Sequence, residues 1–298
     1  MSDLVHTFAG NPLDRGEALR RDETTLSNLA DAADSRFLAF HKLKVLLEDP
    51  QTLAWLPRAE LPEHGQVVFL GSDGEHARFA AEVTHTDQAD AFTDCRAAAA
   101  HLDGADTGIV AQARAQLDWH RRNAFCAECG HAMRAERGGQ ARRCNSCDKH
   151  IFPRTDPVAI MLIVDEPGGD RCLLGQSQGF MAQTNFYSAL AGFVDQGESL
   201  EEAVRREVRE EAGIDVGSVI YHSSQPWPFP SQLMMGCHGI ANSQDIAFDP
   251  TEMADVQWFT RQDVLAALDD QNPTLRVPGS LAIAHHLIRT WATGEVAL

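Results

Sequence analysis

Residues 192–214 read GFVDQGESLEEAVRREVREEAGI, and this stretch decides the fold of the C-terminal half. Ser199 is a favourable N-cap residue, and Glu202, three residues later, completes a capping box. Gly213 suits the left-handed residue that often follows the last turn of a helix. The stretch therefore predicts a helix over residues 200–212 with both of its ends defined.

The acidic residues near the end of this helix are placed against the usual rules. At about 100° per residue, with Glu207 at zero, Glu211 lies near +40° and Glu210 near −60°. The apolar residues in the same sector are Leu200, Ala203 and Val204. Arg205 and Arg209 lie on the opposite face. In a helix with only a structural role, acidic side chains face water. They are also disfavoured in the last turn, where the helix dipole is already negative. The pattern predicts partly desolvated negative charge gathered in one place.

Three carboxylates that converge must hold either protons or cations. Hard oxygen donors of this kind suit Mg²⁺ or Mn²⁺ far better than they suit zinc. Helical phasing alone also allows a solvated run of surface charge. Between these two interpretations, the sequence favours a divalent-metal cluster.

Composition limits the partners of the chain. At 298 residues with 44% hydrophobic content, the chain is long enough for two domains and a well-buried core. A formal charge of −18 repels polyanions, so a phosphate-bearing substrate has to meet a local site of metal ions or clustered arginines. The N-terminus has no basic start followed by an apolar run, and no segment approaches the roughly 18 apolar residues of a membrane span. We expect a soluble, cytoplasmic protein without a membrane segment.

Four of the seven cysteines form two CxxC pairs, Cys126 with Cys129 and Cys144 with Cys147. This spacing lets two thiolate knuckles close on one tetrahedral Zn²⁺, whereas unrelated core cysteines or a redox pair are the alternatives. Four thiolates leave no open position on the metal, so we expect a structural zinc that stabilises a segment with little core of its own.

The segment around these cysteines is basic. Residues 121–149 hold seven Lys or Arg against three Asp or Glu, a side-chain charge of +4 that falls to +2 once four thiolates hold Zn²⁺. Such an island can steer a polyanion such as RNA. A solvated loop surface is the more economical interpretation of the same charges.

Turn and periodicity signals divide the chain into three regions. Residues 66–83 have the pattern of a hairpin, and residues 107–122 have apolar residues at helical spacing. Later stretches predict buried strands at 158–165 and 172–177 and a closing amphipathic helix at 281–292. The predicted domains are a mixed α/β domain at residues 1–122, a zinc ribbon at 123–152 and a catalytic domain at 153–298.

A family resemblance rests on the opening stretch. Gly192, Glu198 and the run from Arg206 to Ile214, REVREEAGI, fill every defining position of the 23-residue Nudix box. The resemblance implies an α/β/α sandwich with a mixed sheet that hydrolyses a nucleoside diphosphate linked to another group. It implies divalent-metal coordination by Glu207, Glu210 and Glu211. Of these, we expect Glu210 or Glu211 to activate the attacking water. It also implies that Glu198 pairs with Arg206 and braces the loop on the helix.

A second motif, Ser224 to Pro230 (SQPWPFP), follows the box. Three alternate prolines fix an extended backbone, so Trp227 and Phe229, two residues apart, point the same way. Such a pair suits stacking on a planar base, while a Pro-rich loop that packs its aromatic residues under its own domain is the alternative.

With the four-cysteine module before the box, this motif resembles the NADH pyrophosphatase subfamily of Nudix hydrolases. The resemblance implies cleavage of NAD(H) to NMN(H) and AMP, homodimerisation and, in bacterial relatives, removal of NAD caps from RNA 5′ ends. It implies dinucleotide contacts or pocket lining by Phe152, Phe193, Gln225, Trp227, Met234 and Ala284. Glu252 would be a further metal carboxylate outside the box.

One position departs from the subfamily pattern, which usually has Ser just before Leu-Met. Here the order is Ser231-Gln232-Leu233-Met234. On an extended segment a shift by one residue turns a side chain to the other face, so a hydroxyl contact is not expected, although Gln232 could reach the same space.

Other functions compatible with the sequence are hydrolysis of another nucleoside diphosphate derivative such as ADP-ribose, and nucleotide sensing without catalysis. The sensor is the less favoured of these, because the box carboxylates are all present and no basic DNA-reading helix is evident. NADH pyrophosphatase and RNA decapping share one chemistry and differ in whether the protein also grips a trailing RNA chain.

Overall fold

The chain divides into two compact units in the computed structural model, which describes residues 5–179, 182 and 184–296. The N-terminal unit comprises Thr7–Thr155 together with Pro226–Ser231. The C-terminal unit comprises Met1–His6, Asp156–Gln225 and Gln232–Leu298. The chain therefore passes more than once from one unit to the other.

A seven-stranded sheet forms the centre of the N-terminal unit, with the order β3-β2-β1-β6-β5, while β4 pairs with β1 and β7 with β2. The strands are β1 (Arg36–His41), β2 (Lys44–Asp49), β3 (Thr52–Leu53), β4 (Trp55–Pro57), β5 (His64–Ser72), β6 (Ala77–Val83) and β7 (Phe92–Thr93). The helices are α1 (Glu23–Asp31), α2 (Cys95–Ala99) and α3 (Gly104–Arg122), and the 3₁₀ helices are η1 (Leu19–Arg21), η2 (Arg58–Glu60), η3 (Ala89–Ala91) and η4 (Arg137–Gly139). The predicted hairpin and helix are confirmed as β5–β6 and α3.

The cysteine segment forms a small antiparallel sheet of its own within this unit. Its order is β10-β9-β8, from β8 (Met133–Glu136), β9 (Ala141–Cys144) and β10 (His150–Ile151). Cys126, Met133 and Cys144 form its buried apolar cluster, with Cys129 and Ile151 packed against them. So small a core cannot supply much folding free energy by itself.

A mixed sheet forms the centre of the C-terminal unit, with the order β14-β15-β11-β12-β16, while β13 pairs with β11. The strands are β11 (Asp156–Val164), β12 (Arg171–Ser177), β13 (Leu190–Phe193), β14 (Val216–Trp227), β15 (Gln232–Ala241) and β16 (Met253–Thr260). The helices are α4 (Leu200–Ala212), α5 (Arg261–Leu268) and α6 (Ile283–Ala292). β11 runs parallel to β15 and antiparallel to β12 and β13.

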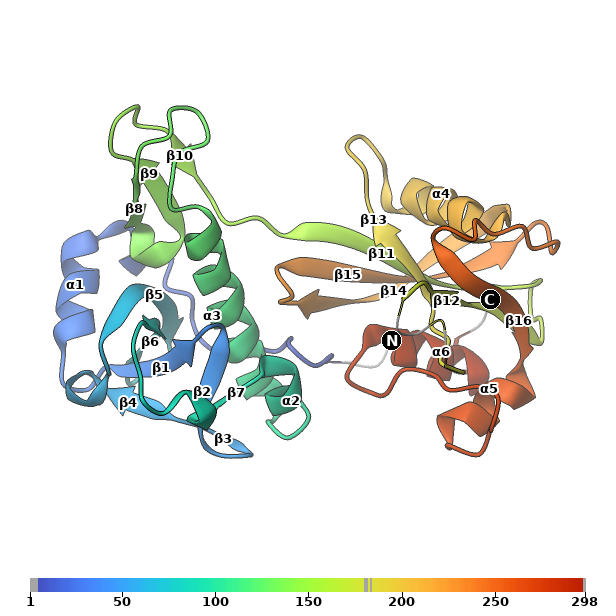
Figure 1. The fold of residues 1–298 in the computed structure, drawn as a ribbon, viewed down its shortest axis with the longest axis horizontal. Coiled ribbons are helices and arrows are strands. Elements are labelled where there is room, and N and C mark those ends of the chain that lie inside the picture. The colour runs from blue at the N-terminus through green and yellow to red at the C-terminus, as the bar shows by residue number, and fades with distance from the viewer. Residues whose placement is uncertain (1–4, 180–181, 183, 297–298) are drawn as a thin grey trace. The chain divides into compact units, whose positions relative to one another are not determined.

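Both faces of this sheet are covered, which makes the unit an α/β/α sandwich, with α4 on one face and α5 and α6 on the other (Figure 1). Ala159, Met161 and Ile163 of β11 point into the core under α4. The alternate residues of the same strand point into the core under α6. Residues 158–164 of β11 are all apolar and buried, because both faces of this part of the strand are covered.

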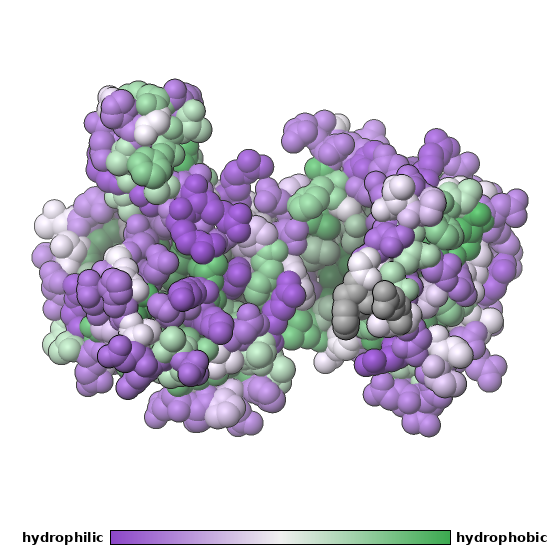
Figure 2. All heavy atoms as spheres, viewed as in Figure 1, coloured by the Kyte–Doolittle hydropathy of each residue, from purple (hydrophilic) through white to green (hydrophobic). Residues whose placement is uncertain are grey.

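The strands expected at 158–165 and 172–177 and the closing helix at 281–292 are confirmed as β11, β12 and α6. No helix within the described residues combines the length and the apolar character needed to cross a membrane. Hydrophilic side chains cover much of the face in view, and hydrophobic ones gather in smaller patches (Figure 2).

Candidate active site

Helix α4 is the element that carries the predicted carboxylates, and its ends are those that the sequence predicts. The Ser199 hydroxyl accepts a hydrogen bond from the Glu202 N–H, and the Glu202 side chain accepts one from the Ser199 N–H. Gly213 follows the last turn with a φ of 72°. Local capping therefore sets the residues at which α4 begins and ends.

The carboxylates do not all lie in the apolar sector of α4. Its buried residues are Ala203, Val204, Val208 and Ala212. Glu207 and Glu211 border this stripe and are partly buried, but the Glu210 side chain is 52% exposed. The prediction that three acids share the apolar face is thus wrong for Glu210. The buried stripe is centred nearer Val208 than Glu207, which leaves Glu210 at its edge.

Arg206 connects the loop before α4 to the carboxylates. Its Nε donates to Glu198 Oε1 at 2.7 Å, and its Nη2 donates to Glu198 Oε2 at 2.9 Å and to the Phe193 carbonyl at 2.8 Å. This is the predicted pair with Glu198, and the Arg206 hydrogen bond is the main reason why the pKa of Glu198 falls to about 2.

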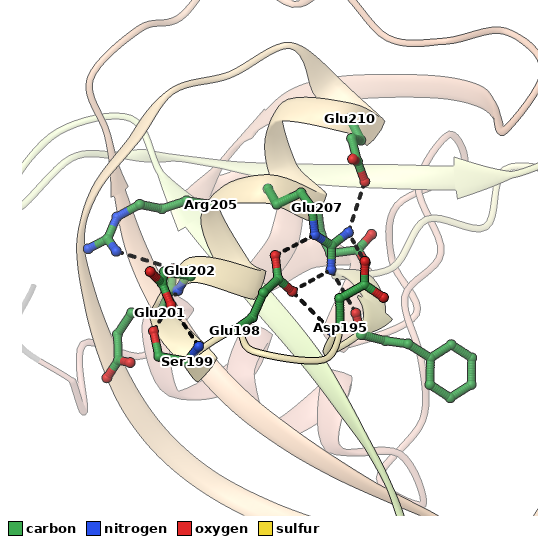
Figure 3. Close-up of polar contacts among 10 residues, drawn as sticks. Asp195, Glu198, Ser199, Glu201, Glu202, Arg205, Glu207 and Glu210 are labelled. Atoms are coloured by element: carbon green, nitrogen blue, oxygen red, sulfur yellow. Dashed lines mark hydrogen bonds and ion pairs between the residues drawn. The ribbon is translucent and has the colours of Figure 1, made fainter.

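The same guanidinium has further partners that sequence reasoning missed. Arg206 Nη1 donates to Glu207 Oε1 at 2.7 Å and to Glu210 Oε2 at 2.9 Å. Glu198, Glu207 and Glu210 all reach this guanidinium with their carboxylates (Figure 3). Arg206 neutralises two of the proposed metal ligands, so these carboxylates must exchange part of that contact for any other cation.

Two residues of strand β13 contact the carboxylates of α4. A Cβ atom at Gly192 would lie 1.9 Å from Glu207 Cδ, so the Glu207 carboxylate occupies the space that any other residue at 192 would fill. The backbone of Ala191 hydrogen-bonds to Glu211. The glycine that opens the 23-residue motif is therefore required by the close approach of a carboxylate, not by its φ angle.

Glu211 is the least compensated of the acids. Its Oε2 is buried and has no hydrogen-bond partner among the described residues. Burial, and next the carboxylate of Glu207, raise the pKa of Glu211 to about 8. Glu252, which precedes β16, and Glu210 raise the same pKa further. Glu211 thus lies within electrostatic reach of all three other predicted metal carboxylates.

These observations fit a divalent cation. A buried, unpartnered carboxylate oxygen among three other carboxylates needs a proton or a metal ion, and an all-oxygen donor set matches Mg²⁺ or Mn²⁺. Among the described residues, however, the four cysteines have ligand atoms close enough together to hold one metal ion, whereas these glutamates do not. The glutamate side chains must therefore draw together to coordinate one ion.

Gly192→Ala tests the contact beneath Glu207. We expect kcat to fall by about 10²-fold or more, because the added methyl group must displace the Glu207 carboxylate. Steady-state kinetics over a Mn²⁺ titration measures the effect. Gly279→Ala is the matched control, since a Cβ there meets nothing within 4 Å. Equal activity of the two variants would remove the structural reason given for Gly192.

The four cysteines form a separate group of potential metal ligands. Their Sγ atoms all lie within 4.8 Å of one another, with 3.7 Å between Cys126 and Cys147 and 3.4 Å between Cys129 and Cys144. A tetrahedron with Zn–S bonds of about 2.3 Å has sulfur atoms about 3.8 Å apart. The Cys144 Sγ also accepts the N–H groups of Ser146 and Cys147, which favours its thiolate form. The arrangement fits a closed, structural zinc site.

The basic charges around this zinc site are mostly compensated. Arg143 pairs with Asp148, Arg134 with Glu136 and Lys149 with Glu128. Arg121 and Arg122 both pair with Asp118, and Arg137 pairs with Glu17. Arg142 is buried and donates a hydrogen bond to the Met133 carbonyl. These pairs favour the interpretation of a solvated surface over that of an RNA-steering island.

Several predicted substrate residues of the C-terminal unit lie on the α6 side of its sheet. Phe193 pairs with Val158 in β11, and Val158 pairs with Met234 in β15, so the three side chains share one row and one face. Phe193 is 53% exposed, an unusual place for a phenylalanine. Ala284 is buried at the start of α6 in the core on which Met234 packs. Contact of these residues with a dinucleotide stays a prediction.

Gln225 lies near the end of β14, and Gln232 is the first residue of β15. Gln225 is fully buried; its amide donates to the Leu281 carbonyl at 2.8 Å and accepts the Ile283 N–H at 2.8 Å. It therefore holds the start of α6, a structural task that the sequence did not indicate. Gln232 opens β15 opposite Asp156.

The remaining two predicted substrate residues, Phe152 and Trp227, belong to the N-terminal unit. Phe152 follows β10 and is 54% exposed. Trp227 packs edge-to-face against Phe229, with ring centroids 5.5 Å apart, which agrees with the prediction that the two rings point the same way.

The sandwich, the capped acidic helix and the four-cysteine site together define a metal-dependent hydrolase fold with an appended zinc ribbon. Comparison with protein-family models finds the NUDIX domain at residues 154–277. It also finds the NADH pyrophosphatase-like rudimentary NUDIX domain at residues 34–119 and the NADH pyrophosphatase zinc ribbon domain at 121–152.

Similar curated proteins carry related names. The chain is 35% identical over 301 residues to the NAD-capped RNA hydrolase NudC of Mycobacterium bovis, covering 99% of this chain and 91% of the relative. It is 46% identical over 195 residues to the NAD-capped RNA hydrolase NUDT12 of Macaca fascicularis, covering 62% of this chain but 42% of that relative. It is 38% identical over 212 residues to the human mitochondrial NAD(P)H pyrophosphatase NUDT13, covering 67% of this chain and 59% of the relative. The chain belongs to the NUDIX family, in the branch with the NADH pyrophosphatase zinc ribbon.

The match at residues 34–119 identifies the N-terminal domain, for which the sequence predicted only a mixed α/β fold. Its hairpin and helix indicated a mixed α/β domain, and the comparison identifies that domain as a rudimentary copy of the NUDIX fold.

Proposed function

We propose that this protein is a metal-dependent pyrophosphatase that hydrolyses NAD(H) to NMN(H) and AMP. The observation that carries the proposal is Glu211, a buried carboxylate with an unpartnered oxygen beside the other motif acids. The subfamily-type motif at Ser224–Pro230 and the names of the similar proteins support the choice of dinucleotide.

Glu207, Glu210 and Glu211, with Glu252, are the residues proposed to hold Mg²⁺ or Mn²⁺. When bound, such ions neutralise the diphosphate and make water more acidic. Glu210 or Glu211 is proposed to take the proton of the attacking water. Arg206 keeps the loop of Phe193 and Glu198 fixed to α4 through the contacts described above. Glu198 and Arg206 thereby serve the site by positioning.

The substrate-binding residues are proposed to be Phe152, Phe193, Gln225, Trp227, Gln232, Met234 and Ala284. Among these, the exposed aromatic rings of Phe152 and Phe193 suit contact with a planar base. The buried amide of Gln225 suits an indirect role, since it holds the start of α6 on which Ala284 lies.

Removal of NAD caps from RNA is the second proposed activity, supported by the names of two of the similar proteins. Cap removal requires the same carboxylates as hydrolysis of free NAD(H), but its substrate also carries an RNA chain. If basic residues grip that chain, cleavage of capped RNA falls steeply with salt while hydrolysis of free NADH does not.

The proposal includes a division into domains at residues 1–122, 123–152 and 153–298, a homodimer and a cytoplasmic location. The cysteine site supports the location, because four thiolates remain available to zinc in a reducing compartment. Sedimentation or light scattering measures the oligomeric state.

One assay tests the proposed reaction. The protein is incubated with NADH, NAD⁺, ADP-ribose or NAD-capped RNA, with Mg²⁺ or Mn²⁺, and the products are separated. Formation of NMNH and AMP from NADH supports the proposal. Faster turnover of ADP-ribose than of NADH points to the alternative nucleoside diphosphate hydrolase, and binding without turnover of any substrate points to a sensor.

Trp227→Ala tests base recognition. We expect KM for NADH to rise about fivefold to 150-fold, because base–aromatic stacking contributes about 1–3 kcal/mol per base. KM for a base-free diphosphate ester should change little. Steady-state kinetics on both substrates decides: equal effects on the two would show that Trp227 does not contact a base.

A further inference from the structure

The recognition loop, Pro226–Ser231, comprises the last two residues of β14 and the four residues that lead to β15, and it belongs to the N-terminal unit. Phe229 is its anchor: the ring packs against the main hydrophobic core of the N-terminal unit, which includes Val45, Val110 and Leu117. The loop is thus held by contacts within the N-terminal unit.

Two arginines of the N-terminal unit contact this loop. Arg96, in α2, places its guanidinium carbon 4.3 Å from the Phe229 ring centroid and 5.3 Å from that of Trp227. Arg114, in α3, lies 4.5 Å from the Phe229 centroid and donates a hydrogen bond from Nη1 to the Pro228 carbonyl. Each guanidinium is within cation–π range of an aromatic ring, and Arg114 also fixes the backbone between the two rings.

Phe8 completes the contacts. Its ring meets those of Trp227 and Phe229 edge-to-face, with centroids 5.8 and 5.7 Å apart. Phe8 is itself buried, and its N–H donates to the Thr107 hydroxyl of α3 at 3.0 Å. Trp227 is therefore bounded by Arg96, Phe8 and Phe229, and these contacts restrict its rotamers.

We propose that Arg96 and Arg114 are positioning residues for the recognition loop, and that the N-terminal unit acts as a clamp that holds Trp227 in one orientation for a planar base. This inference rests on the proposed function, because it assumes that Trp227 stacks on a base of the dinucleotide. It gives the rudimentary NUDIX domain a task in substrate recognition.

The pre-organisation of Trp227 predicts which kinetic constant changes when an arginine is removed. A ring that is already fixed loses little conformational freedom when a base stacks on it, so releasing it weakens binding. The carboxylates of α4 are unaffected by such a change. Loss of either arginine should therefore raise KM for substrates that have a base and leave kcat nearly unchanged.

The kinetic test uses Arg96→Gln and Arg114→Gln in the full-length protein. We expect KM for NADH to rise about fivefold in each variant, with kcat and the turnover of a base-free diphosphate ester within about twofold of the unaltered protein. Arg96→Lys keeps a cation and should restore part of the loss. Arg21→Gln is the control, since Arg21 forms an exposed pair with Glu17 in the same unit.

A double-mutant cycle shows whether Arg96 acts through Trp227. In a Trp227→Leu background, Arg96→Gln should no longer change KM, because the ring that it positions is gone. An undiminished effect of Arg96→Gln in that background overturns the proposal.

A spectroscopic measurement separates this inference from the proposed function. The protein is labelled with 5-fluorotryptophan, and the ¹⁹F resonance of Trp227 is assigned with Trp227→Leu. Arg96→Gln should shift or broaden that resonance and leave the others in place, whether or not the protein hydrolyses NADH. An unmoved Trp227 resonance overturns the clamp. A moved resonance in a protein that hydrolyses no dinucleotide supports the clamp and contradicts the proposed function.

Discussion

Replacing Glu211 by Gln is expected to lower kcat by about 10³-fold or more while leaving the C-terminal unit at least as stable as before. Both expectations follow from one observation, the burial of this carboxylate near Glu207, Glu210 and Glu252. An amide cannot carry the charge that a divalent cation requires. It does remove a buried charge from the neighbourhood of three like charges, so the folded state loses no favourable interaction of comparable size.

Two measurements check this prediction together. The kcat for NADH should show this loss in Glu211→Gln. Mn²⁺ should raise the melting temperature of the unaltered protein much more than that of the variant, because a ligand stabilises only the state that binds it. Glu201→Gln is the matched control, an exposed acid in the first turn of the same helix. A Glu211→Gln protein that keeps most of its activity, or an equal response to Mn²⁺ in both proteins, would contradict the metal assignment.

Local sequence patterns predicted the ends of α4 and the direction of most of its side chains. The capping box at Ser199 and the left-handed Gly213 set the ends of α4, and the 3.6-residue period then set the direction of each side chain. The exception was Glu210, because the position of the buried stripe depends on which residues meet the sheet. That contact is tertiary, and no pattern within the helix contains it.

Other contacts that the sequence did not reveal join distant segments. The space beneath Glu207 exists because β13 lies close under α4, and Gly192 alone does not show what approaches it. Gln225 appeared as a substrate residue because its motif is specific, whereas its amide is taken up by the start of α6, more than fifty residues away.

The Pro-rich loop shows the same limit. Its sequence allowed either stacking on a base or packing under its own domain, and both aromatic rings are packed. They pack within the N-terminal unit, to which the loop belongs, against Phe8, Arg96 and Arg114. A signal existed in composition, since arginine and aromatic residues often pair, but nothing in one sequence indicates which arginine meets which ring.

Removal of the zinc is expected to unfold the ribbon. Its buried apolar residues are few, and Cys126 and Cys144 are themselves proposed metal ligands, so without Zn²⁺ little holds the two knuckles together. Structural zinc contributes on the order of 10 kcal/mol in comparable small modules, far more than so small a core supplies. Cys144→Ser should therefore lose the metal and the order of β8, β9 and β10 together.

Proteolysis and metal analysis measure this outcome, because the ribbon offers trypsin several basic residues that folding protects. The Cys144→Ser protein should contain less than one zinc per chain and be cleaved within residues 121–149, while the C-terminal unit, which has cores of its own on both faces of its sheet, should keep its melting transition. Ser146→Ala is the control, since Ser146 lies in the same knuckle and contributes its backbone N–H rather than its side chain to Cys144. A zinc-free ribbon that resists trypsin as well as the unaltered protein would show that the metal does not determine its fold. A C-terminal unit that melts earlier in Cys144→Ser would show instead that the stability of the NUDIX domain depends on the ribbon.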